Sequence, residues 1–155
     1  MAVKAVPDGY HSITPYLILE DAAKAIEFYK NIFGASEILR LPGPDGKIGH
    51  GEIRIGDSVL MMADETPDMG YRSPKALGGT PVGIMLYVED VDRTFEKALA
   101  SGATVEKPVQ NQFYGDRSGT VVDPFGYKWT IATHVEDVSP EEMQRRIADL
   151  YGKTA

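Results

Sequence analysis

The fold is decided by Tyr16–Ala35 (YLILEDAAKAIEFYKNIFGA) and by its echo at Met85–Ala103 (MLYVEDVDRTFEKALASGA). Both stretches read as a strand, then Glu-Asp, then an amphipathic helix, then Gly-Ala. The Asp of each copy is placed to accept a hydrogen bond from an orphan backbone N–H at a helix start. The Gly of each copy is placed to end that helix in the left-handed conformation. We therefore predict a duplicated unit.

After each Gly-Ala the apolar residues recur with a period of two, which is typical of half-buried strands. We predict three further strands in each copy: Ser36–Leu41, Gly49–Ile55, Ser58–Ala63, and then Thr104–Val109, Ser118–Val122, Tyr127–Thr133. Each half is thus β-α-β-β-β. The expected bounds within one domain spanning residues 1–155 are about 10–64 for module 1, 65–81 for a linker and about 82–134 for module 2.

The C-terminal region carries its own helix signal. Ser139 is a suitable N-cap, a Pro stands at the first helical position, and acids follow, which predicts a helix over about 140–151. Its apolar residues Met143, Ile147 and Leu150 share one face, which must pack on this subunit or on a partner. We favour a partner, and expect a homodimer.

Composition excludes several classes of function. The chain has 155 residues, 43% of them hydrophobic, which suits one domain with a real core. A net charge of −7 without a basic patch disfavours nucleic-acid binding. The absence of Cys excludes disulfides, Cys-based zinc sites and thiolate nucleophiles. The sequence offers no signal-peptide core and no long apolar run, so we expect a cytoplasmic protein without membrane contact.

Strand parity separates an aliphatic face, expected to hold the helix, from a mixed and concave face. The mixed face of the first, fifth and last strands collects candidate ligand-binding residues, namely Thr14, Tyr16, Met85, Tyr87 and Thr130. Together with Tyr114, the tyrosines of this face can stack a planar ligand or pack on one another.

The third predicted strand places His50, Glu52 and Arg54 on one face. His50 and Glu52 are candidate catalytic residues, as a proton-transfer pair or as two metal ligands, and Arg54 could bind a carboxylate or phosphate. The alternative is a solvated strand face with a cross-strand ion pair.

Two further candidates have two interpretations each. Met61 lies in an apolar run that is either an adaptable pocket floor or plain core. Arg117 either projects into the cavity as an anion clamp or ties its loop to an acid such as Asp123.

The repeat resembles the vicinal oxygen chelate superfamily, which includes glyoxalase I, extradiol dioxygenases and bleomycin- and fosfomycin-resistance proteins. The motifs that carry the resemblance are Pro15-Tyr16-Leu17, Phe28-Tyr29 followed by Phe33-Gly34-Ala35, and the run Gly115–Trp129 with Asp123-Pro124-Phe125-Gly126 inside it. The likeness covers roughly Tyr10 to His134 and is strongest to the PhnB-like branch. It implies an α+β fold in which two βαβββ modules form a curved eight-stranded mixed sheet around a cleft, plus the C-terminal helix.

The resemblance also implies where a metal would sit. Metal-using members place a His or Glu on each of four strands, and the matching positions here are Thr14, Met61 (or a neighbour), Gly83 and Thr130. None of these side chains is a ligand for Ni, Zn, Mn or Fe. We therefore expect no cofactor, although a non-standard site on His50 and Glu52 would supply two of the three protein ligands such ions generally take.

Two functions follow as hypotheses. The first is a PhnB-like protein of the glyoxalase/bleomycin-resistance type that binds an unknown small molecule between the modules without the family metal. The second is a lyase or isomerase of glyoxalase type, in which His50 and Glu52 do acid-base work with a relocated divalent metal or none.

Overall fold

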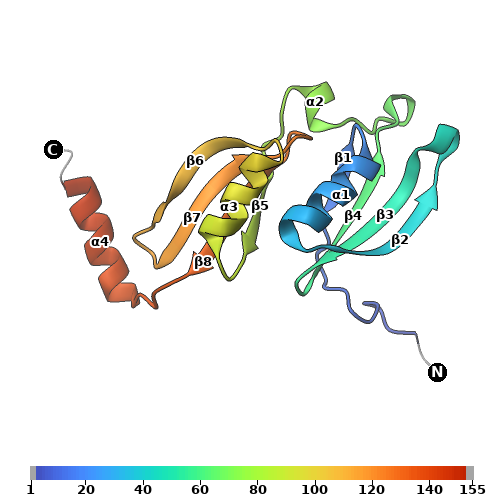
Figure 1. Cartoon of the computed structure of the whole chain (residues 1–155). Helices are drawn as coiled ribbons and strands as arrows, with labels where there is room; N and C mark the ends of the chain where they lie inside the picture. The colour runs from blue at the N-terminus through green and yellow to red at the C-terminus, as the bar shows by residue number, and fades with distance from the viewer. Residues whose placement is uncertain (1–2, 153–155) are drawn as a thin grey trace. The chain divides into compact units, whose positions relative to one another are not determined.

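The computed structural model describes residues 3–152, which form two β-α-β-β-β repeats followed by a helix (Figure 1). The first repeat is β1 (Tyr16–Leu19), α1 (Ala22–Phe33), β2 (Ser36–Pro42), β3 (Ile48–Ile55) and β4 (Ser58–Asp64). The second is β5 (Gly83–Tyr87), α3 (Val91–Ala100), β6 (Thr104–Asn111), β7 (Asp116–Val122) and β8 (Lys128–His134), followed by α4 (Pro140–Gly152). The predicted repeat and the C-terminal helix are confirmed.

The structure corrects two details of the predicted elements. β7 begins at Asp116, two residues before the predicted start, and β6 continues to Asn111. The linker contains the short helix α2 (Pro74–Leu77) and a 3-10 turn at Pro67–Met69. Ser73 caps α2 by accepting a hydrogen bond from the Ala76 N–H at 3.3 Å.

The eight strands are divided between two four-stranded mixed sheets with equivalent orders, β1-β4-β3-β2 and β5-β8-β7-β6. In each sheet the first two strands of this order are parallel and the others antiparallel. The chain divides into two compact units. The first holds the chain up to Pro81 together with Phe125–Tyr127, and the second holds Val82–Pro124 and the chain from Lys128 onward.

The helices form where the repeat predicted them. Asp21 accepts a hydrogen bond from the Lys24 N–H and Asp90 from the Arg93 N–H, both at 3.0 Å. At the other end of α1, Gly34 adopts φ +66°, the left-handed conformation that closes a helix. Both helices therefore begin at the Asp that the duplicated pattern specifies, and α1 ends at its Gly. The prediction was wrong for the end of α3, which is capped by Ser101 at φ −103°, one residue before Gly102.

The core of the first unit lies between α1 and its sheet. Leu19, Ile26, Tyr29, Ile53 and Met62 are fully buried there. Phe125 belongs to this core and packs edge-on against Phe28 and Tyr29, while the Tyr127 hydroxyl bonds to the backbone N–H and C=O of Ile18 at 3.0 and 2.9 Å. The Asp-Pro-Phe-Gly turn therefore connects β7 to β8 and also contributes Phe125 to the core of the first unit.

Asp64 fastens the helix to the sheet within the first unit. Its carboxylate is 9% exposed and accepts one hydrogen bond from the Ala22 N–H at 2.8 Å and another from the Ile48 N–H at 2.6 Å. One side chain thus satisfies a donor at the start of α1 and a donor at the start of β3.

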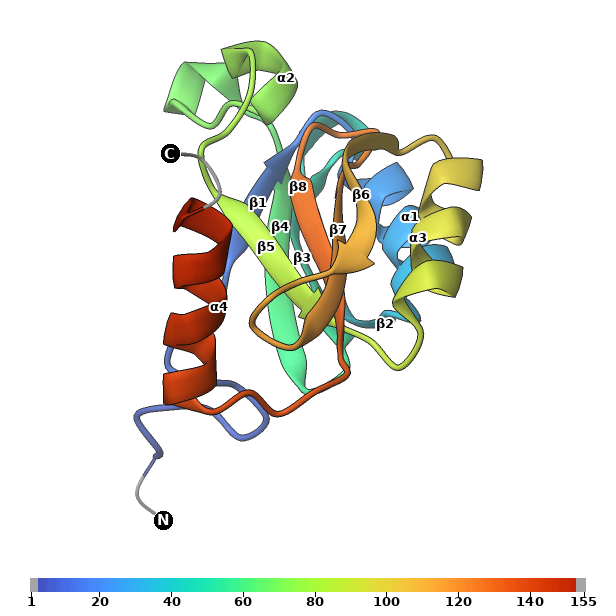
Figure 2. The same ribbon diagram turned by 90° about the vertical axis from the view of Figure 1, so that its left-hand side faces the viewer.

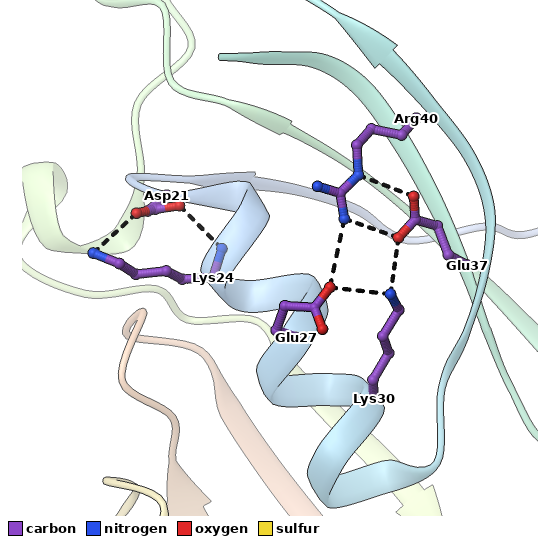
Figure 3. A network of polar contacts seen from close by, with 6 residues as sticks. All are labelled: Asp21, Lys24, Glu27, Lys30, Glu37 and Arg40. Atoms are coloured by element: carbon purple, nitrogen blue, oxygen red, sulfur yellow. Dashed lines mark hydrogen bonds and ion pairs between the residues drawn. The ribbon is translucent and has the colours of Figure 1, made fainter. Parts of the chain in front are cut away.

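Four charged side chains join α1 to the edge strand β2 (Figure 3). Arg40 binds Glu37 through two nitrogens at 2.8 and 2.9 Å, and Lys30 contacts both Glu27 and Glu37 at 3.0 and 3.1 Å. The Arg40 and Lys30 hydrogen bonds hold the pKa of Glu37 below its ordinary value.

Because this network lies at the surface, Arg40→Met is expected to lower the melting temperature by only about 2 °C at low salt. The difference should disappear near 1 M salt, where screening acts over about 3 Å. Lys24→Met, which removes an exposed pair with Asp21 outside this network, is the control. A loss in Arg40→Met that persists at high salt contradicts an electrostatic role.

The helix α4 begins as predicted, with the Ser139 hydroxyl accepting a hydrogen bond from the Glu142 N–H at 3.2 Å. Within the second unit it lies on the side of the sheet away from α3 (Figures 1 and 2). Arg146 binds Glu136 at 2.6 and 2.9 Å and the Phe113 carbonyl at 3.1 Å. Met143 and Ile147 are half-buried and Leu150 is exposed. Packing on a partner stays a prediction.

Candidate functional site

The two faces of the first sheet differ: one packs against α1, and the other carries the candidate site residues. A Cβ on Gly51 would lie 3.5 Å from Ile26 of α1, so this position of β3 faces the helix. His50, Glu52 and Arg54 alternate with it and point to the other face, as strand parity predicted. Tyr16 pairs with Met61, and Met61 pairs with Glu52, so these three side chains share that face.

A chain of hydrogen bonds crosses this face. The Tyr16 hydroxyl lies 2.8 Å from His50 Nδ1, and His50 Nε2 lies 2.8 Å from Glu52 Oε1. The Tyr10 hydroxyl donates to the other carboxylate oxygen of Glu52. We call these four residues the Tyr-His-Glu relay. Glu52 is 6% exposed and Tyr16 is 47% exposed, so the relay runs from a buried carboxylate to an accessible phenol.

The relay sets the charge of its members. Burial opposes ionisation of Glu52, but the hydrogen bonds from Tyr10 and His50 outweigh it and hold the pKa of Glu52 below its ordinary value. Burial, followed by the nearby Tyr71 and Glu52, raises the pKa of Tyr16. The geometry thus combines an ionised carboxylate with a neutral phenol, which differs from the alternative of a solvated strand face because Glu52 is buried.

The other predicted residues of the first unit have distinct positions. Met61 is half-buried beside Tyr16, and Thr14 is half-buried just before β1. Arg54 donates to the Gly9 carbonyl at 3.0 Å, so it holds the segment that brings Tyr10 over Glu52.

The second unit has an equivalent face. A Cβ on Gly119 would clash with Phe95 of α3 at 2.7 Å, so Ser118 and Thr120, its neighbours along β7, face away from that helix. On this opposite face Met85 pairs with Thr130, and the Thr130 and Thr120 hydroxyls lie 2.9 Å apart.

A second polar cluster lies on this unit. The Tyr87 hydroxyl donates to the buried carboxylate of Asp116 at 2.8 Å. His134 lies between Asp116 at 2.7 Å and Asp137 at 2.9 Å. These two hydrogen bonds raise the pKa of His134, and the hydrogen bond to Asp116 followed by burial raises that of Tyr87.

The raised pKa of His134 predicts a pH-dependent contribution to stability. The contribution is complete below the ordinary histidine value of about 6.5 and is lost as the pH rises through the higher folded value. We expect the melting temperature to fall more between pH 6 and pH 9 in the wild type than in His134→Gln. His11→Gln, at an exposed residue, is the control and should behave as the wild type. Equal pH dependence in all three proteins contradicts the prediction.

Arg117 is not on this face. It binds Asp92 of α3 through two nitrogens, both at 2.8 Å, and Asn111 at 3.1 Å, on the helix side of the sheet. The anion-clamp interpretation is therefore wrong for this geometry, because the fork of the guanidinium is already occupied. The alternative interpretation, in which Arg117 binds an acid, agrees with the structure, but the acid is Asp92 and not Asp123. Asp123 instead accepts a hydrogen bond from the Trp129 indole N–H at 2.8 Å. Tyr114 packs edge-on against Phe113.

The residues do not fit a divalent metal ion. At the family positions stand Thr14, Met61, Gly83 and Thr130, which offer hydroxyls, a thioether and a hydrogen. Among residues 3–152, no group of three or more His, Asp or Glu side chains is placed to hold a metal. His50 and Glu52 contribute two ligands, and each already has a tyrosine as its second partner.

Sequence reasoning missed four members of these clusters, namely Tyr10, Asp116, His134 and Asp137. Tyr10 lies outside any strand, so no periodicity pointed to it. Asp116 and His134 are paired across β7 and β8, and that pairing was hidden because the predicted strands stopped short of both residues. The candidates Tyr16, His50, Glu52 and Met61 are brought together on the first sheet. That they share one cleft with Met85, Tyr87 and Thr130 stays a prediction.

Two β-α-β-β-β repeats with opposed helix and site faces define a class of protein, and the comparison with known families agrees. The model of the Glyoxalase/Bleomycin resistance protein/Dioxygenase superfamily matches residues 10–131. The chain belongs to this superfamily.

The chain is similar in sequence to one individual protein and in fold to two solved structures, as follows. The chain is 45% identical over 147 residues to the uncharacterized protein Mb0911c of Mycobacterium bovis, covering 93% of this chain and 94% of that protein. The fold is similar to that of the PhnB protein from Bacillus cereus, with a TM-score of 0.64, 18% identity and coverage of 79% and 99%. It is also similar to that of the fosfomycin resistance protein FosX from Listeria monocytogenes complexed with Mn(II) and sulfate, with a TM-score of 0.62, 22% identity and coverage of 88% and 97%.

Within residues 3–152, no helix is both long and apolar enough to span a bilayer.

Proposed function

We propose that this protein binds a small organic molecule on the Tyr16 face of its first sheet, without the divalent metal found in the FosX complex. The observation that carries the proposal is the Tyr-His-Glu relay, which is the kind of preorganised polar group that fixes a ligand beside apolar surface. Met61 and the exposed ring of Tyr16 supply that apolar surface.

Native mass spectrometry of protein purified without chelator tests this function. We expect an organic adduct at one per chain and metal well below one per chain. The adduct should be lost in Met61→Ala and kept in Met69→Ala, which truncates an exposed methionine outside the site. Stoichiometric metal, or an adduct that survives Met61→Ala, contradicts the proposal.

A glyoxalase-type lyase or isomerase is the second candidate. It is favoured by one observation, the 2.8 Å contact between His50 and the buried Glu52, because a carboxylate beside an imidazole is suited to proton transfer. Activity tests with and without added Ni, Zn or Mn distinguish the candidates. Turnover that is abolished in His50→Gln supports the enzyme, and the absence of turnover under every condition supports the binding protein.

A homodimer is also part of the proposal, supported by the half-buried Met143 and Ile147 and the exposed Leu150 on α4. Sedimentation of the full chain and of a chain ending at Thr133 tests it. A dimer that becomes a monomer on truncation is expected, whereas an unchanged dimer removes the role of α4.

A further inference from the structure

When His50 is neutral, the ionised Glu52 sets the direction of each hydrogen bond in the relay. The lowered pKa of Glu52 keeps it ionised near neutral pH, and a carboxylate can only accept. The Tyr10 hydroxyl and the Nε2–H of His50 therefore both donate to Glu52. A neutral imidazole that carries its proton on Nε2 has a lone pair on Nδ1. The Tyr16 hydroxyl, 2.8 Å from Nδ1, must then donate to His50.

This order of protons decides what Tyr16 can offer to a ligand. Its one hydrogen is directed at His50, so the phenol oxygen keeps only acceptor capacity toward the exposed side. Tyr16, Met61, Glu52 and Leu39 are aligned across β1, β4, β3 and β2 in consecutive pairs, which places apolar side chains on both sides of the buried carboxylate. A ligand here meets an acceptor oxygen beside apolar surface.

We infer that Tyr16 receives a hydrogen bond from the ligand, which is an apolar molecule carrying an O–H or N–H donor, and that Tyr10 is a positioning residue for Glu52. The inference rests on the proposed function for the existence of a ligand. The order of the protons in the relay does not depend on a ligand. An experiment can therefore contradict the proton order and the existence of a ligand independently.

The proton order is tested by NMR of the full chain with ¹⁵N-labelled histidine. We expect His50 to be the Nε2–H tautomer when neutral, and this preference to weaken in Tyr10→Phe and to be lost in Glu52→Gln. Tyr151→Phe, at an exposed tyrosine of α4, should leave the tautomer unchanged. A dominant Nδ1–H tautomer in the wild type overturns the inference. An unchanged tautomer in Tyr10→Phe overturns the positioning role.

The ligand class is tested with phenol and anisole, which differ in the O–H donor. Binding is followed through the ¹³C-methyl signal of Met61, assigned with Met61→Leu. One neutral hydrogen bond contributes about 1 kcal/mol, so we expect phenol to bind about 5-fold more tightly than anisole. The preference should disappear in Tyr16→Phe and persist in Tyr151→Phe. Equal binding to the wild type overturns the donor class. If neither phenol nor anisole binds, the result contradicts both the proposed class of ligand and the proposed site. The order of the protons in the relay is then still tested by the tautomer of His50.

Discussion

Asp64→Ala is expected to lower the free energy of unfolding by about 3 kcal/mol, because two buried backbone donors lose their acceptor at once. The N–H groups of Ala22 and Ile48 both donate to this carboxylate, and the side chain is 9% exposed. Truncation leaves each donor unsatisfied in a place that water reaches poorly.

Denaturant unfolding followed by far-UV circular dichroism measures this loss. The single tryptophan, Trp129, belongs to the second unit, so its fluorescence shows whether the effect spreads there. Asp68→Ala, which truncates an exposed acid in the same unit, is the matched control and should change stability by less than about 0.5 kcal/mol. An Asp64→Ala protein as stable as this control shows that the carboxylate does not hold α1 to β3.

Glu52→Gln is expected to lower the free energy of unfolding by about 2 kcal/mol at pH 7, since two hydrogen bonds to a charged acceptor are weakened. An amide keeps one acceptor oxygen, but it presents an NH₂ group where the carboxylate accepted a second donor. Tyr10 and His50 therefore cannot both go on donating to separate oxygens of this side chain.

The pH dependence of this difference follows from the pKa of Glu52. Because the pKa is lowered in the folded protein, its contribution is present above the ordinary glutamate value of 4.5 and is lost as the pH falls through the folded value. The gap between wild type and Glu52→Gln should thus narrow toward pH 3. Glu96→Gln, at an exposed position on α3, is the control. A gap that stays constant from pH 7 to pH 3 contradicts an ionised Glu52 in the relay.

The fold could be predicted from the sequence because the patterns that specify it act between residues close together in the chain. The caps Asp21 and Asp90 act on N–H groups three residues away, and alternation along a strand reports its two faces directly. The shared face of His50 and Glu52 followed from the same alternation. Sequence motifs alone also predicted the family, which the match to residues 10–131 confirms.

What the sequence could not show depends on contacts between distant segments. Tyr10 reaches Glu52 across 42 positions, and Arg117 reaches Asp92 across 25. Parity places a side chain on a face only when the strand bounds are right, and β7 begins two residues before the predicted start. Arg117 therefore fell outside the predicted strand, and its partner could not be inferred.

A crystal structure of the full chain, purified without chelator, tests the central claim most directly. The account predicts electron density for an organic molecule against Tyr16 and Met61, with a hydrogen-bond donor within about 3 Å of the Tyr16 oxygen. A divalent cation held by three or more side chains at His50 and Glu52 would contradict it.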